Sequence, residues 1–265
     1  MATAGKTAAS LVELTVERHV ALLTLANPER RNVLDEPMAT ALREAAERAA
    51  GLEDVRCVIV TGSGNTFAAG ADLRQVEAAS TAENLAYNAQ LRAAVDAVAA
   101  LPVPSIAAVN GHAIGGGLEL ALACTLRVAA AEAKLGMPEA RLGIIPATGG
   151  LARLPRLVGP ATAAKMLLTG DLVEAADARA IGLVDAIAPA AEVLPEALKL
   201  AARIATAAPL STRAIVETLR TDADLPIAEA NLRTEERLAT LLDSADRREG
   251  ARAFLERRDP EFGGR

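Results

Sequence analysis

The chain has 265 residues, of which 51% are hydrophobic, so it is rich enough in apolar side chains to build a sizeable core and is not a disordered protein. Its formal net charge of -6 argues against a nucleic-acid-binding protein, which needs a clustered excess of Lys and Arg to neutralise phosphates. Only two histidines occur, and Cys57 and Cys124 stand in apolar runs without ligand-type spacing. We therefore expect no metal site and two buried free thiols.

The N-terminal residues 1–10 are small and polar, and we expect them to be frayed. They contain no apolar run long enough for a signal peptide, and no stretch of about 18 apolar residues, the length that would span a membrane, occurs in the chain. We expect a cytoplasmic protein with no membrane partner.

The first half of the chain alternates strand patterns with helix patterns. Apolar and polar residues alternate over 11–16, which predicts a half-buried strand, while continuous apolar runs at 55–62 and 105–111 predict strands that are buried on both faces. The other elements predicted in this half are a strand at 20–26, helices from about 37 to 50 and 81 to 101, a helical run at 118–125 and a short strand at 126–130. Beyond Leu151 the pattern is almost entirely helical, and the last sixty residues predict three amphipathic helices. The chain is therefore expected to be an α/β protein.

Two glycine-rich loops, at 67–73 and 110–120, each follow a predicted buried strand. Neither matches a dinucleotide fingerprint or a P-loop. Consecutive glycines at the start of a helix expose N–H groups that have no partner within the helix, at the electropositive end of its dipole. One such donor from each loop could stabilise the oxygen of a thioester carbonyl as it gains charge. The alternative is that the glycines only let a helix pack closely against a strand.

One glutamate lies at the end of the second loop, and another lies beyond it. Glu119 lies in a helix otherwise made of Leu and Ala, where a charged side chain is costly unless it is paired or functional. Glu139 follows Pro138 and could be only a first-turn carboxylate that the helix dipole favours. If both face one partly dry cavity, one pKa rises, and the pair provides a base and an acid at neutral pH.

Several segments, in this order and spacing, resemble the crotonase superfamily, which is the enoyl-CoA hydratase/isomerase family. They are FAAGADL, NGHAIGGGLELALAC, LGMPEARLGIIPATGGLARLPRLVG, LTGDLVEAADARAIGLVDAI and EGARAFLERRDPEF. The resemblance implies an α/β fold made of a crotonase-like spiral of ββα units with a C-terminal helical segment. It assigns residues 1–200 to the core that carries the CoA and active sites and residues 201–265 to a helical segment for trimer assembly. A homotrimer or a homohexamer is expected.

The resemblance also assigns roles to the residues singled out above. The backbone amides of Ala71 and Gly116 match the oxyanion-hole positions. Glu119 matches the carboxylate that helps to activate water, and Glu139 matches the acid that protonates the α-carbon. Ala147 stands where hydratases often carry glycine beside the bound water, so its methyl group would tighten the water pocket. The residues that match CoA-binding positions are Arg30, Arg31, Val33, Ala69, Gly70, Asp72, Leu73 and Arg257.

The function that the resemblance implies is hydration of a trans-2-enoyl-CoA to a 3-hydroxyacyl-CoA, with the CoA thioester as substrate and no other cofactor. Alternatives are another reaction of the superfamily, such as enoyl-CoA isomerisation or hydration of a branched or aromatic substrate. A protein of a different class, which binds acyl-CoA without catalysis, is a further alternative, because fold alone does not define function.

Overall fold

The computed structural model describes residues 11–265, so the N-terminal residues expected to be frayed lie outside the described part. Within residues 11–265, ten strands form two sheets, and the predicted α/β class is confirmed. The large sheet has the order β1-β2-β3-β5-β7-β10, with β1 antiparallel to β2 and the other neighbours parallel. Its strands are β1 (Val12–Glu17), β2 (Val20–Leu25), β3 (Cys57–Gly62), β5 (Ser105–Val109), β7 (Leu126–Ala130) and β10 (Ala186–Ala188).

The small sheet has the order β4-β6-β8-β9, in which only β9 runs antiparallel to its neighbour. Its strands are β4 (Thr66–Ala68), β6 (His112–Ile114), β8 (Lys134–Gly136) and β9 (Val173–Glu174). The chain therefore spirals: β3, β5 and β7 each lie in the large sheet, and the strand that follows each of them lies in the small one. A helical segment comes after each strand pair, so every turn of the spiral is a ββα unit.

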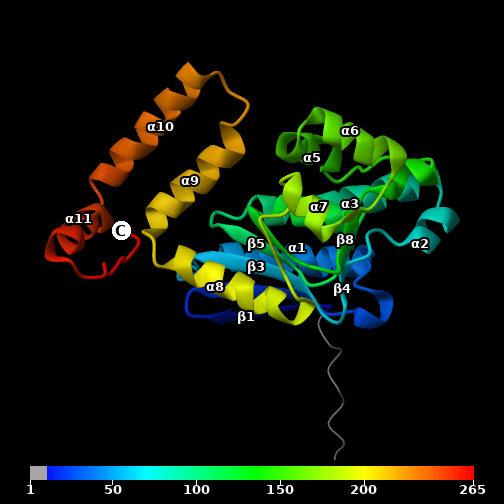
Figure 1. The fold of residues 1–265 in the computed structure, drawn as a ribbon, viewed down its shortest axis with the longest axis horizontal. Coiled ribbons are helices and arrows are strands. Elements are labelled where there is room, and N and C mark those ends of the chain that lie inside the picture. The colour runs from blue at the N-terminus through cyan, green and yellow to red at the C-terminus, as the bar shows by residue number, and fades with distance from the viewer. Residues whose placement is uncertain (1–10) are drawn as a thin grey trace, which may run out of the picture.

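Helices cover the sheets, as Figure 1 shows. Helix α1 packs on β1, β2 and α3, while α8 packs on the central strands of the large sheet. The helices are α1 (Glu36–Ala50), α2 (Leu73–Ala78), α3 (Thr81–Ala99), α4 (Gly116–Ala123), α5 (Gly150–Val158), α6 (Pro160–Thr169), α7 (Ala175–Ala180), α8 (Val193–Ala205), α9 (Pro209–Thr221), α10 (Ile227–Leu242) and α11 (Ala245–Glu256). The described part of the chain also has the 3-10 helices η1 (Pro28–Arg30), η2 (Pro138–Leu142) and η3 (Ala190–Glu192).

The predicted long elements agree with these bounds, and the short ones differ. The glycine loops contain strands β4 and β6, which were expected to be irregular, and β9 and β10 lie in the part expected to be helical. These strands have two or three residues, too few for an alternating pattern to appear in the sequence. The two cysteines are buried and free, as predicted, and burial raises the pKa of each thiol to about 12.

Helices α9, α10 and α11 confirm the prediction of three C-terminal helices, and they stand beside the body of the molecule (Figure 1). The division proposed at residue 200 falls inside α8, which packs on the large sheet. Arg56 links the two parts, because its guanidinium donates to the carbonyls of Ala205 and Phe262 at 2.9 and 2.7 Å. Within residues 11–265, no helix is both long and apolar enough to cross a membrane.

Candidate active site

One cavity, of about 630 Å³, is lined by the residues that were predicted to carry out catalysis. Both glutamates, the two residues of the proposed oxyanion hole and Ala147 lie in its wall. Most of the remaining wall is apolar. The lining residues are Ala71, Val76, Thr81, Asn84, Leu85, Tyr87, Asn88, Leu91, Gly116, Glu119, Glu139, Gly143, Ile144, Ile145, Pro146, Ala147 and Thr148.

The two glycine loops touch each other at Gly70 and Gly116. A Cβ on Gly70, whose φ is +87°, would lie 2.7 Å from the carbonyl oxygen of Ile114 and 3.3 Å from the nitrogen of Gly116. Helix α4 starts at Gly116, so the N–H of this residue is one of those that an α-helix leaves unpaired. Among the described residues, neither the N–H of Gly116 nor that of Ala71 donates a hydrogen bond. Two residues with free N–H groups, carried by loops that touch each other, therefore line the same cavity.

The flanking glycines of the triplet have steric roles. A Cβ on Gly115 would lie 2.6 Å from Oε1 of Glu139, so this glycine makes room for the carboxylate. A Cβ on Gly117 would lie 2.2 Å from the carbonyl oxygen of Ala68 in β4. Close packing of helix against strand, the alternative considered from the sequence, thus accounts for Gly117 but leaves the free amide of Gly116 unexplained.

Glu119 extends from the first turn of α4 and is only 2% exposed. Its Oε1 accepts hydrogen bonds from the backbone N–H groups of Thr148 at 2.8 Å and Gly150 at 2.7 Å. Its Oε2 accepts one from the hydroxyl of Thr148. Thr148 and the first residue of α5 thus supply three donors, which match an ionised carboxylate because that form only accepts.

Glu139 lies in the first turn of η2 and is 8% exposed. In contrast to Glu119, it has a buried oxygen, Oε2, without a hydrogen-bond partner among the described residues. Burial, aided by the charge of Glu119, raises the pKa of Glu139 to about 7. An unpartnered carboxyl in a partly dry site favours the neutral, protonated form. The cavity therefore holds one carboxylate that is fully hydrogen-bonded beside one carboxyl that is poised to carry a proton.

The first segment predicted to bind CoA contains two adjacent arginines, Arg30 and Arg31, which differ in their contacts. Arg30 pairs with Asp35 at 2.5 Å and with Asp72 at 2.6 Å, so its charge is engaged in joining the start of α1 to the start of α2. Arg31 is exposed, and within residues 11–265 its guanidinium has no acceptor. Val33 is buried beside it. Of the two adjacent arginines, Arg31 is the one whose charge is available to a ligand.

The second loop segment predicted to bind CoA lies against the first. The N–H of Ala69 donates to the carbonyl of Arg31 at 3.1 Å, and the N–H of Leu34 donates to the carbonyl of Gly70 at 2.8 Å. Leu73 begins α2 and is exposed. These hydrogen bonds hold the two segments together next to Ala71, which lines the cavity.

Arg257 does not join this surface within one chain. It is the C-cap of α11, at the opposite end of the molecule from α2, which follows the loop segment predicted to bind CoA (Figure 1). The sequence does not indicate whether the chain brings Arg257 back to this loop, because 183 residues lie between Leu73 and Arg257.

Two polar residues of the site were missed in the sequence. Thr148 donates twice to Glu119, yet threonine in a loop carries no pattern of its own. Tyr87, the single tyrosine of the chain, is 3% exposed and lines the cavity. A lone aromatic residue among small and polar ones in a predicted helix was the available signal.

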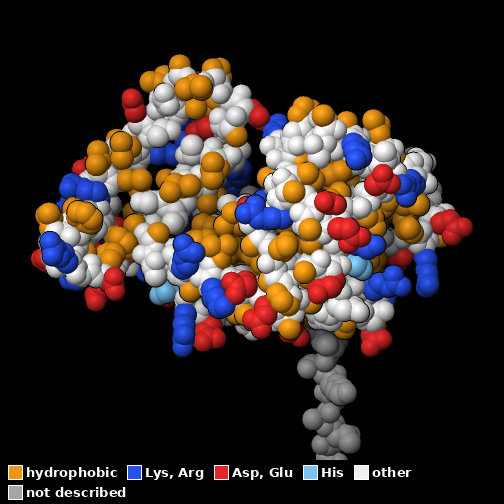
Figure 2. Space-filling model, viewed as in Figure 1, with side chains coloured by type: hydrophobic (Ala, Val, Ile, Leu, Met, Phe, Trp, Pro, Cys, Tyr) orange, Lys and Arg blue, Asp and Glu red, His pale blue; other side chains and the backbone are white. Residues whose placement is uncertain are grey.

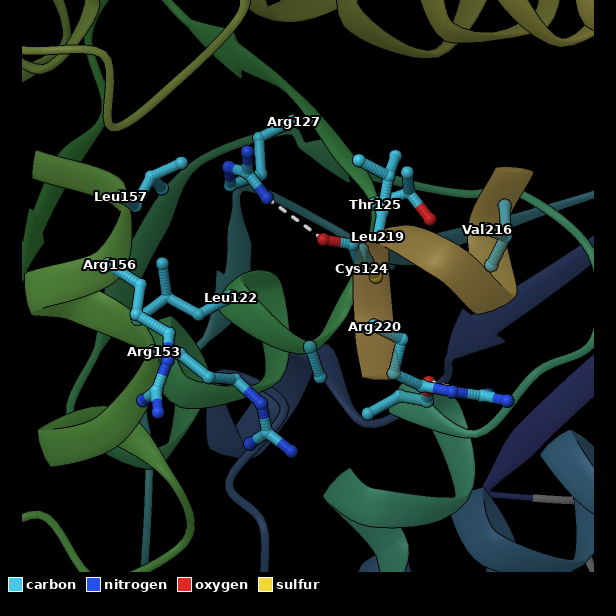
Figure 3. Close-up of a pocket in the computed structure, with 12 residues that line it drawn as sticks. Leu122, Cys124, Thr125, Arg127, Arg153, Arg156, Leu157, Val216, Leu219 and Arg220 are labelled. Carbon is cyan, nitrogen blue, oxygen red and sulfur yellow. Dashed lines mark hydrogen bonds between the residues drawn. The ribbon is translucent and has the colours of Figure 1, made fainter. Parts of the chain in front are cut away.

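A second cavity, of about 330 Å³, lies between α4, α5 and α9 (Figure 3). Four arginines line it, and each already has an acceptor. Arg127 donates to the carbonyl of Cys124 at 2.9 Å, and Arg220 donates to that of Ala99 at 3.4 Å. The two arginines of α5 form ion pairs, Arg153 with Asp96 and Arg156 with Asp224. The four arginines are therefore explained by their contacts within the protein, as structural residues.

No group of three or more His, Cys, Asp or Glu side chains suited to a metal ion occurs within residues 11–265.

Comparisons with known proteins agree on one family. A model of the family described as enoyl-CoA hydratase/isomerase matches residues 15–265. A 2,3-dehydroadipyl-CoA hydratase of Escherichia coli (strain K12) is 41% identical over 257 residues, which cover 96% of this chain and 99% of that protein. A crotonyl-CoA hydratase of Syntrophomonas wolfei is 38% identical over 255 residues, covering 94% and 96%. The crystal structure of an enoyl-CoA hydratase from Bacillus anthracis matches with a TM-score of 0.94 at 32% identity, covering 96% of this chain and all of that one.

Proposed function

The chain belongs to the enoyl-CoA hydratase/isomerase family and is an enzyme of it, and from this premise we propose that Glu119 and Glu139 together add water to a trans-2-enoyl-CoA to give a 3-hydroxyacyl-CoA. The crotonase-like spiral expected from the resemblance is confirmed by the match to solved enoyl-CoA hydratases. One observation carries the proposal: two carboxyl groups in contrasting environments share a cavity with two backbone amides that lack acceptors.

The amides of Ala71 and Gly116 bind the thioester oxygen in this proposal. As water adds to the β-carbon, the electrons of the double bond move toward the carbonyl, and its oxygen becomes negative. Donors fixed in advance stabilise that charge, and losing one such donor typically costs about 10²–10³ in kcat. The N-terminus of α4 adds its positive dipole end to the same point.

The two glutamates divide the proton transfers. Glu119, held by three donors, orients the water and accepts its proton as the C–O bond forms at the β-carbon. Glu139, whose pKa is raised to about 7, gives its proton to the α-carbon. Exchange with solvent then returns a proton to Glu139 and removes one from Glu119. Because both carboxyls act on one water and one double bond, they operate as a unit.

This arrangement favours hydration over isomerisation of the double bond. An isomerase needs one group that removes and returns a proton, a task that Glu139 could perform alone. The donors that hold Glu119 would then have no catalytic purpose, and a buried charge without a function is costly.

The CoA moiety lies along the loop surface that contains Arg31, Val33, Ala69, Gly70, Asp72 and Leu73. Arg31, with its free guanidinium, contacts the phosphates, whereas Arg30 holds the loop through its two ion pairs. Arg257 reaches CoA only from a neighbouring subunit, because α11, which it caps, lies on the side of its own subunit opposite the CoA-binding loops. The thioester is the substrate, and the reaction needs no further cofactor.

We also propose that α9, α10 and α11 mediate assembly into a homotrimer or a homohexamer. Helix α10 has no buried residue, and several large apolar side chains of this segment are exposed, including Leu219, Ile227, Leu232, Phe254 and Leu255. Figure 2 shows groups of apolar side chains exposed along these helices. An exposed apolar surface of this kind indicates an interface with another chain. Light scattering coupled to size exclusion would give the mass of the assembly.

A substrate panel tests the function. Short, medium and branched trans-2-enoyl-CoA thioesters should lose their conjugated absorbance on addition of enzyme, with formation of 3-hydroxyacyl-CoA. Persistent absorbance across the whole panel, or conversion only to shifted double-bond isomers, would remove the hydratase proposal.

A further inference from the structure

The hydroxyl of Tyr87 contacts the loop that carries Ala71, at the neighbouring residue Asp72. It accepts a hydrogen bond from the N–H of Asp72 at 3.1 Å and donates one to the carbonyl of Leu34 at 2.5 Å. Tyr87 is 3% exposed, and burial raises its pKa to about 12, so the hydroxyl keeps its proton throughout the neutral range.

Leu34 holds the same loop from its other end. The N–H of Leu34 donates to the carbonyl of Gly70 at 2.8 Å. The peptide unit that joins Gly70 to Ala71 and the one that joins Ala71 to Asp72 are therefore both anchored, the first to the N–H of Leu34 and the second to its carbonyl through the hydroxyl of Tyr87.

These anchors determine the direction of the N–H of Ala71. In a planar trans peptide the C=O and N–H bonds point in opposite directions. The carbonyl of Gly70 points to Leu34, so the N–H of Ala71, which belongs to the same peptide unit, points away from Leu34. The hydroxyl of Tyr87 fixes the next peptide unit and so limits rotation of Ala71.

We propose that Tyr87 is a positioning residue of the oxyanion hole, which aligns the N–H of Ala71 through the loop of hydrogen bonds that joins Asp72, Tyr87 and Leu34. The inference rests on the proposed function of Ala71 as an oxyanion donor. Tyr87 acts through the backbone and does not touch the reacting atoms. Its ring contributes to the cavity wall, and its hydroxyl contributes the alignment.

Tyr87→Phe tests the inference, since it removes the hydroxyl and retains the ring. Deleting an oxyanion donor outright costs about 10²–10³ in kcat, so misaligning one should lower kcat by about 10–100-fold, with KM within about twofold of the parent. Ser80→Ala is the matched control on the same helix. It removes the capping box that Ser80 forms with Glu83 but leaves the hydrogen bonds of Tyr87 in place. This control should retain parent kcat.

The spectroscopic measurement uses an aryl enoyl-CoA that carries an electron-donating ring, because its absorbance moves to longer wavelength when donors polarise its carbonyl. At saturating ligand, the parent and Ser80→Ala should give the full red shift and Tyr87→Phe a smaller one. An equal shift and equal kcat in parent and Tyr87→Phe would overturn the role of Tyr87 while leaving the oxyanion hole intact. Absence of a red shift in the parent would overturn the oxyanion hole itself, and equal losses in both variants would assign the effect to loosening of α3.

Discussion

Glu119 and Glu139 line the same cavity, but only Glu119 has hydrogen-bond donors on both carboxylate oxygens. Oε2 of Glu139 is buried without a partner among the described residues, and the nearby charge of Glu119 adds to the effect of burial in raising the pKa of Glu139. Two chemically similar side chains thereby have different environments, which suits the proposed roles of Glu119 as the acceptor and Glu139 as the donor of a proton.

The pKa of Glu139 predicts the pH dependence of the reaction. Glu139 must be protonated to donate to the α-carbon, and its pKa is raised to about 7, so kcat/KM should fall as the pH rises through about 7. Well above that pH the fall should approach about tenfold per pH unit, as for loss of a single essential proton. Rates measured from pH 5 to 9 provide the test. A profile that stays flat from pH 6 to 9 would show that Glu139 is not the acid.

Thr148 should be needed for its hydroxyl as well as for its backbone. Thr148→Val keeps the N–H that binds Oε1 of Glu119 but removes the donor to Oε2. A hydrogen bond to a charged group contributes about 1.5–3 kcal/mol, so kcat should fall by about 10–100-fold. Thr148→Ser, which retains the hydroxyl, is the matched control and should stay within about threefold of the parent. Equal rates for the two variants would assign the orientation of Glu119 to the backbone alone.

Gly115 should be intolerant of a methyl group because of Glu139. In Gly115→Ala the Cβ would lie 2.6 Å from Oε1 of Glu139, at a φ of +54°, so the carboxyl must move. We expect loss of at least about 100-fold in kcat, since general acid–base catalysis typically contributes about 10²–10⁴-fold.

Gly159→Ala is the control for backbone strain in that experiment. Gly159 also has a positive φ, of +80°, but no heavy atom lies within 4 Å of the place that a Cβ would take, and the residue is not part of the cavity wall. Both variants place a side chain at a positive φ, which costs about 1–3 kcal/mol, so both should be less stable than the parent, but only Gly115→Ala displaces Glu139. The measurements are kcat and thermal melts of both variants. A comparable kcat in Gly115→Ala and Gly159→Ala would show that displacing Glu139 does not affect catalysis.

The sequence predicted the long elements of the fold and the residues that share the cavity. The helix patterns predicted from about 37 to 50 and from 81 to 101 correspond to α1 and α3, and the structure adds their side-chain N-caps, Asp35 and Ser80. Three-residue strands such as β6 were not predictable, because pairing between segments far apart in the chain stabilises them, and a period of two cannot appear in so few residues.

The polar contacts behind the site were also beyond sequence reasoning. Glu119 could be singled out as a charge in an apolar helix, but its donor Thr148 lies 29 residues away and is defined only by the turn that precedes α5. In the same way Arg30 and Arg31 look alike in the sequence. Arg30 forms ion pairs with Asp35 and Asp72, which cap α1 and α2. Only the folded structure brings these three residues together.

The most direct measurement of the central claim is the hydration rate of Glu119→Gln, Glu139→Gln and the double variant at saturating trans-2-enoyl-CoA. Both substitutions preserve side-chain size while removing the ability to exchange a proton. Each single variant should lose about 10²–10⁴-fold in kcat, and the double variant should be little slower than the poorer single one, since the two carboxyls act as a unit. A single variant that keeps kcat within about tenfold of the parent, while it still binds CoA thioester, would contradict the two-glutamate account.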